Sequence, residues 1–230
     1  MSCSVYALGQ AGSALSLSLK ALQKQPDVLF LSVPDHAIEA VAQQLAQDPQ
    51  FKAPAVIAHL SGSYSWEVLG ALKEHAALAQ FHPLAALKNS SPIPPNSLCA
   101  ISSNCPHALH TLQDLARKMQ LRPIQLSHGK TIEYHTACTL TGNLTLALVQ
   151  LSIEKMAEAG VPEPLAREGL ASLLHSVASN LESRTLAEAL TGPVKRGDQQ
   201  TIERHLSVLH GTSRQIYEML TNQLRSILSK

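Results

Sequence analysis

The sequence predicts an α/β fold, with a doubly wound parallel sheet in the first half of the chain and only helices in the second half. In the first half, short apolar runs with β-branched or alternating residues are separated by stretches with helical periodicity. Strands that alternate with helices form parallel β-α-β crossovers. After residue 127 no strand-like run recurs, and long helical stretches take over. We therefore expect one domain over residues 1–127 and a second, all-α domain over residues 128–230.

The expected strands are short and follow one another through the first half of the chain. The first covers residues 2–8, and the turn after it, residues 9–12, opens a helix that reaches about residue 23. Further strands are expected at residues 27–33, 55–61, 78–84, 97–102 and 123–126. Helices are expected between them at residues 38–47, 65–75 and 106–119.

The second half is expected to be a set of long helices. The first, from about residue 130 to residue 159, would be roughly 45 Å long at about 1.5 Å per residue. Its centre, residues 144–153, is apolar around most of its circumference, so we expect it to be buried on several sides. It is long enough to span a membrane, but His135, Asn143 and Gln150 favour a helix buried in protein. The other helices are expected at residues 164–184, 199–209 and 213–228.

Composition argues against several classes of partner. The 230 residues contain 18 Lys plus Arg against 17 Asp plus Glu, without the basic excess of a general nucleic-acid binder. Aromatic residues make up 3% of the chain, too few for stacking of single-stranded nucleic acid. A small-molecule ligand is therefore expected, with no nucleic acid and no membrane.

The cysteines and the N-terminal segment favour a cytoplasmic protein. Cys3, Cys99, Cys105 and Cys138 form no C-x-x-C pair, and a chain of this size needs no disulfide staples. No basic residue precedes Lys20, which argues against a signal peptide. We expect a protein of the reducing cytosol.

A candidate cofactor site begins at the first turn. Gly9, Gln10, Ala11 and Gly12 lie between a strand and a helix, where backbone amides at a helix N-terminus could bind a pyrophosphate. Because Ala7 stands where the full fingerprint has glycine, a tight turn without a ligand is an equal alternative.

The next expected strand ends in Val33, Pro34 and Asp35. The carboxyl ends of strands form the ligand crevice of doubly wound sheets, so these residues are candidate cofactor contacts. However, only 14 residues separate Gly12 from Asp27, which is room for one helix. A complete dinucleotide fold has a second strand there, whose end binds the ribose roughly 20 residues after the glycines. Weak or absent dinucleotide binding is therefore expected.

Two further strand ends carry groups suited to acid-base chemistry. His59, Ser61 and Gly62 follow one strand, and His82 with Pro83 follows the next. Two imidazoles and a hydroxyl at one edge could transfer protons near neutral pH. The alternative is that His59 is a buried residue bonded to backbone, and for His82 both interpretations stay open. None of the eleven histidines forms an H-x-x-x-H pair with a carboxylate nearby, so no metal site is expected.

Polar residues also interrupt the long helix of the second half. His135 and Asn143 are eight residues apart, a little over two turns, and so share approximately one face. Polar groups in so apolar a helix cost free energy unless they are paired with neighbouring helices or used on a ligand. A later segment, from Leu190 through Pro193 to Asp198, is interpreted as a helix break followed by an N-cap.

Taken in order, these motifs resemble the Rossmann-like NAD(P) oxidoreductases that carry a helical C-terminal domain of unknown function. These are relatives of 6-phosphogluconate dehydrogenase, pyrroline-5-carboxylate reductase and prephenate dehydrogenase. The resemblance implies a truncated Rossmann-like sheet followed by an all-α domain. It also implies NADP or NAD at residues 9–12 and 33–35, catalysis by Ser61 and His82, and substrate binding by His135 and Asn143. The lysine that precedes this asparagine by four residues in hydroxyacid dehydrogenases is Thr139 here.

Two functions are therefore carried forward. The first is an NAD(P)-dependent oxidoreductase acting on a small carbonyl or hydroxyl metabolite. The second is a degenerate binding or scaffold protein that has lost dinucleotide binding. For both we expect a homodimer formed through the helical domain, because the apolar circumference of residues 144–153 exceeds what one such domain can cover.

Overall fold

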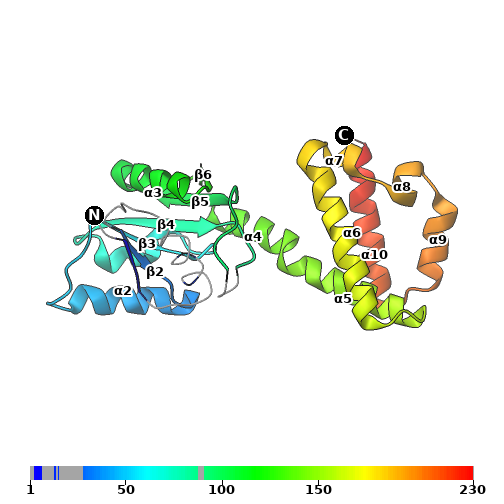
Figure 1. Cartoon of the computed structure of the whole chain (residues 1–230), viewed down its shortest axis with the longest axis horizontal. Coiled ribbons are helices and arrows are strands. Elements are labelled where there is room, and N and C mark those ends of the chain that lie inside the picture. The colour runs from blue at the N-terminus through cyan, green and yellow to red at the C-terminus, as the bar shows by residue number, and fades with distance from the viewer. Residues whose placement is uncertain (1–2, 7–12, 14, 16–27, 88–90, 230) are drawn as a thin grey trace. The chain divides into compact units, whose positions relative to one another are not determined.

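The computed structural model describes residues 3–6, 13, 15, 28–87 and 91–229 (Figure 1). It comprises two compact units, Met1–Asn143 and Leu144–Lys230. The first contains the sheet and its helices and the second contains only helices among its described residues, which confirms the α/β prediction. The predicted division after residue 127 corresponds to the end of the last strand, whereas the two units divide after one further helix.

The six strands expected from the sequence form one sheet in chain order, β1-β2-β3-β4-β5-β6. They are β1 (Cys3–Tyr6), β2 (Val28–Leu31), β3 (Val56–His59), β4 (Ala77–Pro83), β5 (Leu98–Ser103) and β6 (Arg122–Gln125). All neighbouring strands are parallel except β4 and β5. The carboxyl ends of β1, β2, β3 and β4 therefore lie at the same edge of the sheet.

The antiparallel pairing of β4 with β5 corrects the expectation of a wholly parallel sheet. A parallel pair needs a crossover connection, usually a helix, that carries the chain back to the starting edge. The connection between these strands, residues 84–97, contains Pro92, Pro94 and Pro95 and no helix in its described part. The chain consequently turns at the edge where β4 ends and runs back beside it.

Helices cover both faces of the sheet, as Figure 1 shows. Alternate residues of β2 point to opposite faces: Phe30 packs in the hydrophobic cluster that contains residues of α3 (Pro106–Lys118), and Leu31 packs in the cluster that contains residues of α2 (Ile38–Gln47). The segment expected as a helix at residues 65–75 is the 3-10 helix η2 (Trp66–Leu72), which lies on the α2 face. This is the expected doubly wound arrangement.

Leu15, between β1 and β2, is fully buried on the α3 face of the sheet. The helix α2, which leads from β2 to β3, packs on the opposite face.

The long helix expected at residues 130–159 is broken into two. α4 (Thr131–Thr141) ends at Gly142, and α5 (Asn143–Glu158) begins directly after it. Glycine is a poor helix former because it loses most backbone entropy on ordering. By length and composition Thr131–Glu158 is apolar enough to cross a membrane, and the apolar stretch of 18 residues within it contains no buried residue. The expected burial of residues 144–153 is therefore not achieved within the single chain.

The remaining helices follow the predicted order. They are α6 (Glu163–Ser183), α7 (Leu186–Ala189), α8 (Gly192–Arg196), α9 (Gln199–Ser207) and α10 (Gly211–Leu228), of which α7 and α8 were not predicted. Asp198 accepts a hydrogen bond from the Thr201 amide at 3.0 Å and so caps α9, which confirms the predicted N-cap. Gly197 before it has a φ of 66°, a left-handed conformation that favours glycine.

Candidate functional site

The candidate site lies at the carboxyl edge of β2, β3 and β4. Asp35 follows β2, Ser61 follows β3, and His82 is the penultimate residue of β4. The register aligns Leu31 with His59 and His59 with Gln80, so these strand ends are immediate neighbours. The predicted convergence of the strand-end residues at one edge is therefore confirmed.

Ser61 belongs to a hydrogen-bonded loop that is closed by Asp35. Its hydroxyl donates to Oδ2 of Asp35 at 2.9 Å, and the Ser63 hydroxyl donates to the same oxygen at 2.6 Å. The Ser61 oxygen in turn accepts the amide of Ser63 at 3.1 Å and that of Tyr64 at 3.3 Å. Two strand ends are thus tied together by one carboxylate.

His59 has the structural role considered in the sequence analysis. Its side chain is fully buried, its Nδ1 accepts the Ser61 amide at 3.2 Å, and its Nε2 lies 3.0 Å from the carbonyl oxygen of Ser65. With one nitrogen accepting and the other facing a carbonyl oxygen, the ring is the neutral Nε2–H tautomer. Burial lowers the pKa of His59 to about 4. His59 therefore shapes the loop and does not face a ligand.

A buried polar chain holds the backbone of Ser61 to the sheet. Gln80, in the middle of β4, donates from Nε2 to the Ser61 carbonyl at 2.9 Å, and its Oε1 accepts the Ser102 hydroxyl at 2.9 Å. Sequence reasoning missed both residues. A glutamine inside the apolar run of β4 was the available signal, because a buried amide needs partners.

His82 lies between Gly62 and α4. Its Nδ1 is 2.9 Å from the Tyr134 hydroxyl oxygen, and its ring meets the His135 ring edge to face at a centroid distance of 5.9 Å. A Cβ atom on Gly62 would lie 2.8 Å from Cε1 and Nε2 of His82 and 2.5 Å from Cδ2 of His135. Both imidazoles thus pack directly on the backbone of Gly62, where a larger residue would have to displace them.

The environment keeps both partners of this hydrogen bond uncharged near neutral pH. Burial lowers the pKa of His82 to about 4, with a further contribution from repulsion by His135. Burial also raises the pKa of the Tyr134 hydroxyl, as does its hydrogen bond with Cys138. A neutral imidazole and a protonated phenol therefore face each other.

A cavity of about 630 Å³ opens beside this pair within the first unit. Its walls include His82, Tyr134, His135, Cys138 and Asn143. The structure thus brings together three of the predicted site residues, His82, His135 and Asn143. Ser61 is not part of this wall, and no hydrogen bond among the described residues joins it to His82.

The candidate cofactor residues fall in two groups. Gly9, Gln10, Ala11 and Gly12 lie outside the described residues. Residues 33–35, Val33, Pro34 and Asp35, lie at the carboxyl end of β2, one strand away from β1. They fit the nicotinamide side of a dinucleotide site, at the edge where such ligands bind.

The adenosine side of a dinucleotide does not fit equally well. In a complete dinucleotide fold the strand beyond β1 carries the residue that binds the ribose. In the described part of the chain β1 is the end strand of the sheet. Within the same part, no group of three or more His, Cys, Asp or Glu side chains is placed to hold a metal ion.

Comparisons with family models match both halves of the chain. Residues 5–84 match a Rossmann-like domain, and residues 97–224, more than half of the chain, match a domain of unknown function, DUF2520. Among proteins with curated descriptions, none is similar enough in sequence to count as a match.

Solved structures share the fold over nearly the whole chain. A Thermotoga maritima protein has a TM-score of 0.78 at 23% identity, covering 99% of this chain and 98% of its own. A protein of Bacteroides fragilis described as an NADP oxidoreductase has a TM-score of 0.76 at 16% identity, covering 97% of both chains. A pyrroline-5-carboxylate reductase of Streptococcus pyogenes has a TM-score of 0.61 at 15% identity, covering 97% of this chain and 98% of its own.

Proposed function

The chain belongs to the family of the domain of unknown function DUF2520, and we propose that it is an NAD(P)-dependent oxidoreductase acting on a small carbonyl or hydroxyl compound. The observation that carries this proposal is the neutral His82, held between Tyr134 and Gly62 beside a cavity at the carboxyl edge of a Rossmann-like sheet. The description of the Bacteroides fragilis protein as an NADP oxidoreductase supports the same class of reaction.

The residues of the site have different roles in the proposed reaction. A reduced nicotinamide, when bound, supplies a hydride. His82 acts as the general acid or base that transfers the proton at the reacting oxygen. His135 and Asn143 complete the wall of the cavity that would hold the substrate. The Ser61 hydroxyl donates a hydrogen bond to Asp35, so the contribution of Ser61 in this arrangement is to hold the loop on the cofactor side.

Cofactor binding is expected to be weak, because the strand that would hold the adenosine ribose lies nowhere in the described sheet. Calorimetric titration with NADPH, NADH, NADP and NAD tests this directly. We expect dissociation constants above about 1 μM, equivalent to less than roughly 8 kcal/mol of binding free energy. Reduced nicotinamide mononucleotide should bind within about tenfold of NADPH, since the adenosine half adds few contacts. A submicromolar value for NADPH would show that the adenosine site is complete.

Activity is tested by following NADPH oxidation with a panel of aldehydes and ketones. His82→Gln should reduce the rate by about 10²-fold or more, the usual contribution of a positioned acid or base. His75→Gln is the matched control, because His75 is exposed and precedes β4. The end position of β1 favours the second candidate, a binding protein without hydride chemistry. That candidate is supported if nicotinamide nucleotides neither bind nor turn over.

We also infer that the functional form is a homodimer joined through the helical unit. The described part of residues 144–230 has four buried side chains: Ala166, Leu170, Ile202 and Thr221. Large apolar side chains are exposed on four of its helices, among them Leu146 on α5, Leu173 on α6, Leu186 on α7 and Met219 on α10. So small an interior cannot stabilise a unit of this length.

The exposed apolar surface of the helical unit is better suited to a second copy of the chain than to lipid. An apolar cavity of about 400 Å³ opens on the same unit, with Leu148 and Leu220 in its wall. Asn143, Gln150 and Glu154 interrupt the apolar helix α5 with groups that lipid cannot satisfy. With Cys99, Cys105 and Cys138 all free thiols, we place the protein in the reducing cytoplasm.

A further inference from the structure

The contact between Tyr134 and His82 joins α4 to β4 at the wall of the cavity. The hydroxyl oxygen of Tyr134 lies 2.9 Å from Nδ1 of His82, and the two rings meet edge to face at 84°, with centroids 5.6 Å apart. The position of the proton in this hydrogen bond decides what the other imidazole nitrogen can do, because a neutral imidazole carries one N–H and one lone pair.

Chemistry favours the proton on the tyrosine oxygen. A phenol, with an ordinary pKa of about 10, is a far better donor than a neutral imidazole N–H, and an imidazole nitrogen is the better acceptor. Burial lowers the pKa of His82 to about 4 and raises that of Tyr134, so neither group is charged near neutral pH. The phenol has one proton to donate, and Nδ1 is a better acceptor than the sulfur of Cys138, so Tyr134 donates to Nδ1 and Nε2 of His82 carries the remaining hydrogen.

Nε2 of His82 is available to a ligand. It lies against Gly62, and none of the hydrogen bonds among the described residues uses it. In the same part of the chain no buried side-chain nitrogen or oxygen lacks a partner, so Nε2 is not fully buried, and His82 is a residue of the cavity wall. An accessible N–H on a neutral ring is a hydrogen-bond donor for a group that has a lone pair.

We propose that Tyr134 holds His82 as the Nε2–H tautomer, so that the cavity takes the oxygen of an aldehyde or ketone and rejects a protonated imine. This inference rests on the oxidoreductase function proposed above and names its substrate class. A carbonyl oxygen accepts a hydrogen bond from Nε2–H. The nitrogen of a protonated imine has no lone pair and carries its own N–H, so the same donor repels it.

The arrangement also accounts for the proton that the reaction needs. Reduction of a carbonyl compound requires a proton at oxygen in addition to the hydride that a reduced nicotinamide supplies at carbon. As the C–O π bond breaks and its electron pair moves to oxygen, the oxygen takes the proton of Nε2. Nδ1 takes the proton of Tyr134, and water reprotonates the phenolate. The transfer is favourable because an alkoxide is a stronger base than a phenolate.

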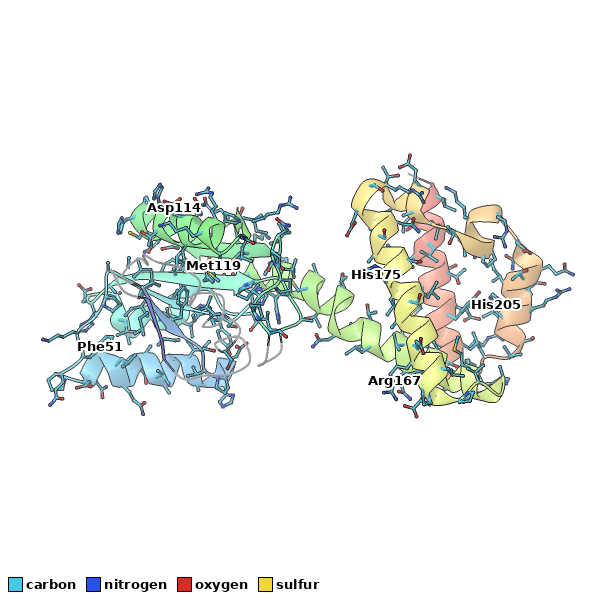
Figure 2. All side chains as sticks on the ribbon, viewed as in Figure 1. Phe51, Asp114, Met119, Arg167, His175 and His205 are labelled. Carbon is cyan, nitrogen blue, oxygen red and sulfur yellow. The ribbon has the colours of Figure 1, made fainter. Side chains whose placement is uncertain are left out.

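A second tyrosine and histidine pair provides a matched control. In the helical unit, the Tyr217 hydroxyl lies 2.7 Å from Nδ1 of His205, with the rings at 89° and 5.7 Å apart. This pair is exposed, and Figure 2 shows His205 on α9. It has the same chemistry as Tyr134 and His82, and it also lines a cavity, the apolar one of the helical unit, but its hydrogen bond is exposed.

The tautomer is measured by ¹⁵N–¹H correlation spectra of the histidine side chains in the full-length protein near neutral pH, with His82→Gln assigning the signal. We expect His82 to be the Nε2–H tautomer. Tyr134→Phe keeps the ring and removes the donor, so it should yield a mixture of tautomers. Tyr217→Phe should leave the His82 signal unchanged. An Nδ1–H tautomer in the unmodified protein overturns the inference without any variant, and so does a His82 signal that Tyr134→Phe does not alter.

The substrate class is measured by NADPH oxidation with ketones and aldehydes against imines of the same carbon skeleton. We expect kcat/KM to be at least tenfold higher for the carbonyl compounds. Tyr134→Phe should lower kcat about tenfold or more with KM nearly unchanged, as expected for a residue that acts through His82. A preference for the imines overturns this inference and leaves the oxidoreductase function standing. Turnover of neither class contradicts the oxidoreductase function, while the spectra still decide the tautomer.

Discussion

The imidazole rings of His82 and His135 meet edge to face over the backbone of Gly62, with their planes at 82°. One ring comes from β4 and the other from α4. The absence of a side chain on Gly62 lets both rings pack on the loop after β3. The spacing of the two imidazoles therefore depends on a residue that has no functional group of its own.

Gly62→Ala should disturb both rings. The new Cβ would lie within 2.8 Å of each imidazole, closer than packed atoms allow, so one or both rings must move. We expect a loss of about 1–3 kcal/mol in the free energy of unfolding, and altered NMR signals for His82 and His135. Gly70→Ala is the control, since a Cβ there meets nothing within 4 Å. Equal stability of the two variants would show that the loop yields without cost.

Asp35→Asn should loosen the loop between β3 and η2. Oδ2 of Asp35 accepts the hydroxyls of Ser61 and Ser63, and a neutral amide is a weaker acceptor than a carboxylate. The free energy of unfolding, measured with urea, should fall by about 1 kcal/mol. Asp114→Asn, on α3 (Figure 2), removes only exposed pairs with His110 and Arg117, and should change it by less than about 0.5 kcal/mol. A larger loss for Asp114→Asn would contradict this assignment.

Stability should fall on mild acidification because of His59. Its pKa is about 4 in the folded protein against 6.5 for the free side chain, so the unfolded chain binds a proton first as the pH falls. Above pH 6.5 both states are neutral and nothing is lost. Between pH 6.5 and pH 4 this one residue removes about 3 kcal/mol from the free energy of unfolding.

Urea denaturation at a series of pH values measures that loss, with His82 adding to it in the same direction. His59→Gln should reduce the slope of the pH dependence and leave the part that His82 contributes, whereas His75→Gln, at an exposed position, should leave the slope unchanged. A slope in His59→Gln as steep as in the unmodified protein would assign the acid sensitivity to other groups.

The oligomeric state is the fourth prediction. Light scattering should give about twice the 24.7 kDa mass of the chain. Leu148→Lys, on α5, should reduce this mass or prevent folding, because it places a charge in the apolar surface of the helical unit. Gln150→Lys puts the same charge on a polar, exposed position of α5 and should leave the dimer intact. A monomer at tens of micromolar for the unmodified protein would show that the chain covers this surface itself.

Strand positions were predictable in most cases because β2, β3, β4 and β5 are mostly buried apolar runs. The expected strand 78–84 is β4 at Ala77–Pro83, for example. The direction of β5 was not predictable, since it depends on the path of the connection and not on the residues of the strand. The break at Gly142 was also missed, because one glycine costs a helix only about 1 kcal/mol and the apolar pattern continues across it.

The candidate site shows the same division. Its placement at one edge followed from parallel strands, which is why Ser61 and His82 were correctly placed at the same edge of the sheet, although no hydrogen bond among the described residues joins them. Their partners were not predictable. Asp35 is 26 residues from Ser61, and Tyr134 is 52 residues from His82, so only the fold brings each pair together. Whether these residues are catalytic is a prediction that the experiments above decide.

In the described sheet β1 is the end strand, so the strands that carry the site residues do not depend on what lies beyond it. Each strand that leads to a site residue, β2, β3 or β4, has a neighbour on both sides, and the row from Leu31 through His59 to Gln80 is set without β1. Strands inserted in the chain between Gly12 and Asp27 would add beyond β1 and break no existing ladder. Strands that bind the nucleotide can therefore be added beyond β1 or removed there, by evolution or by grafting, while the acid-base residues keep their register.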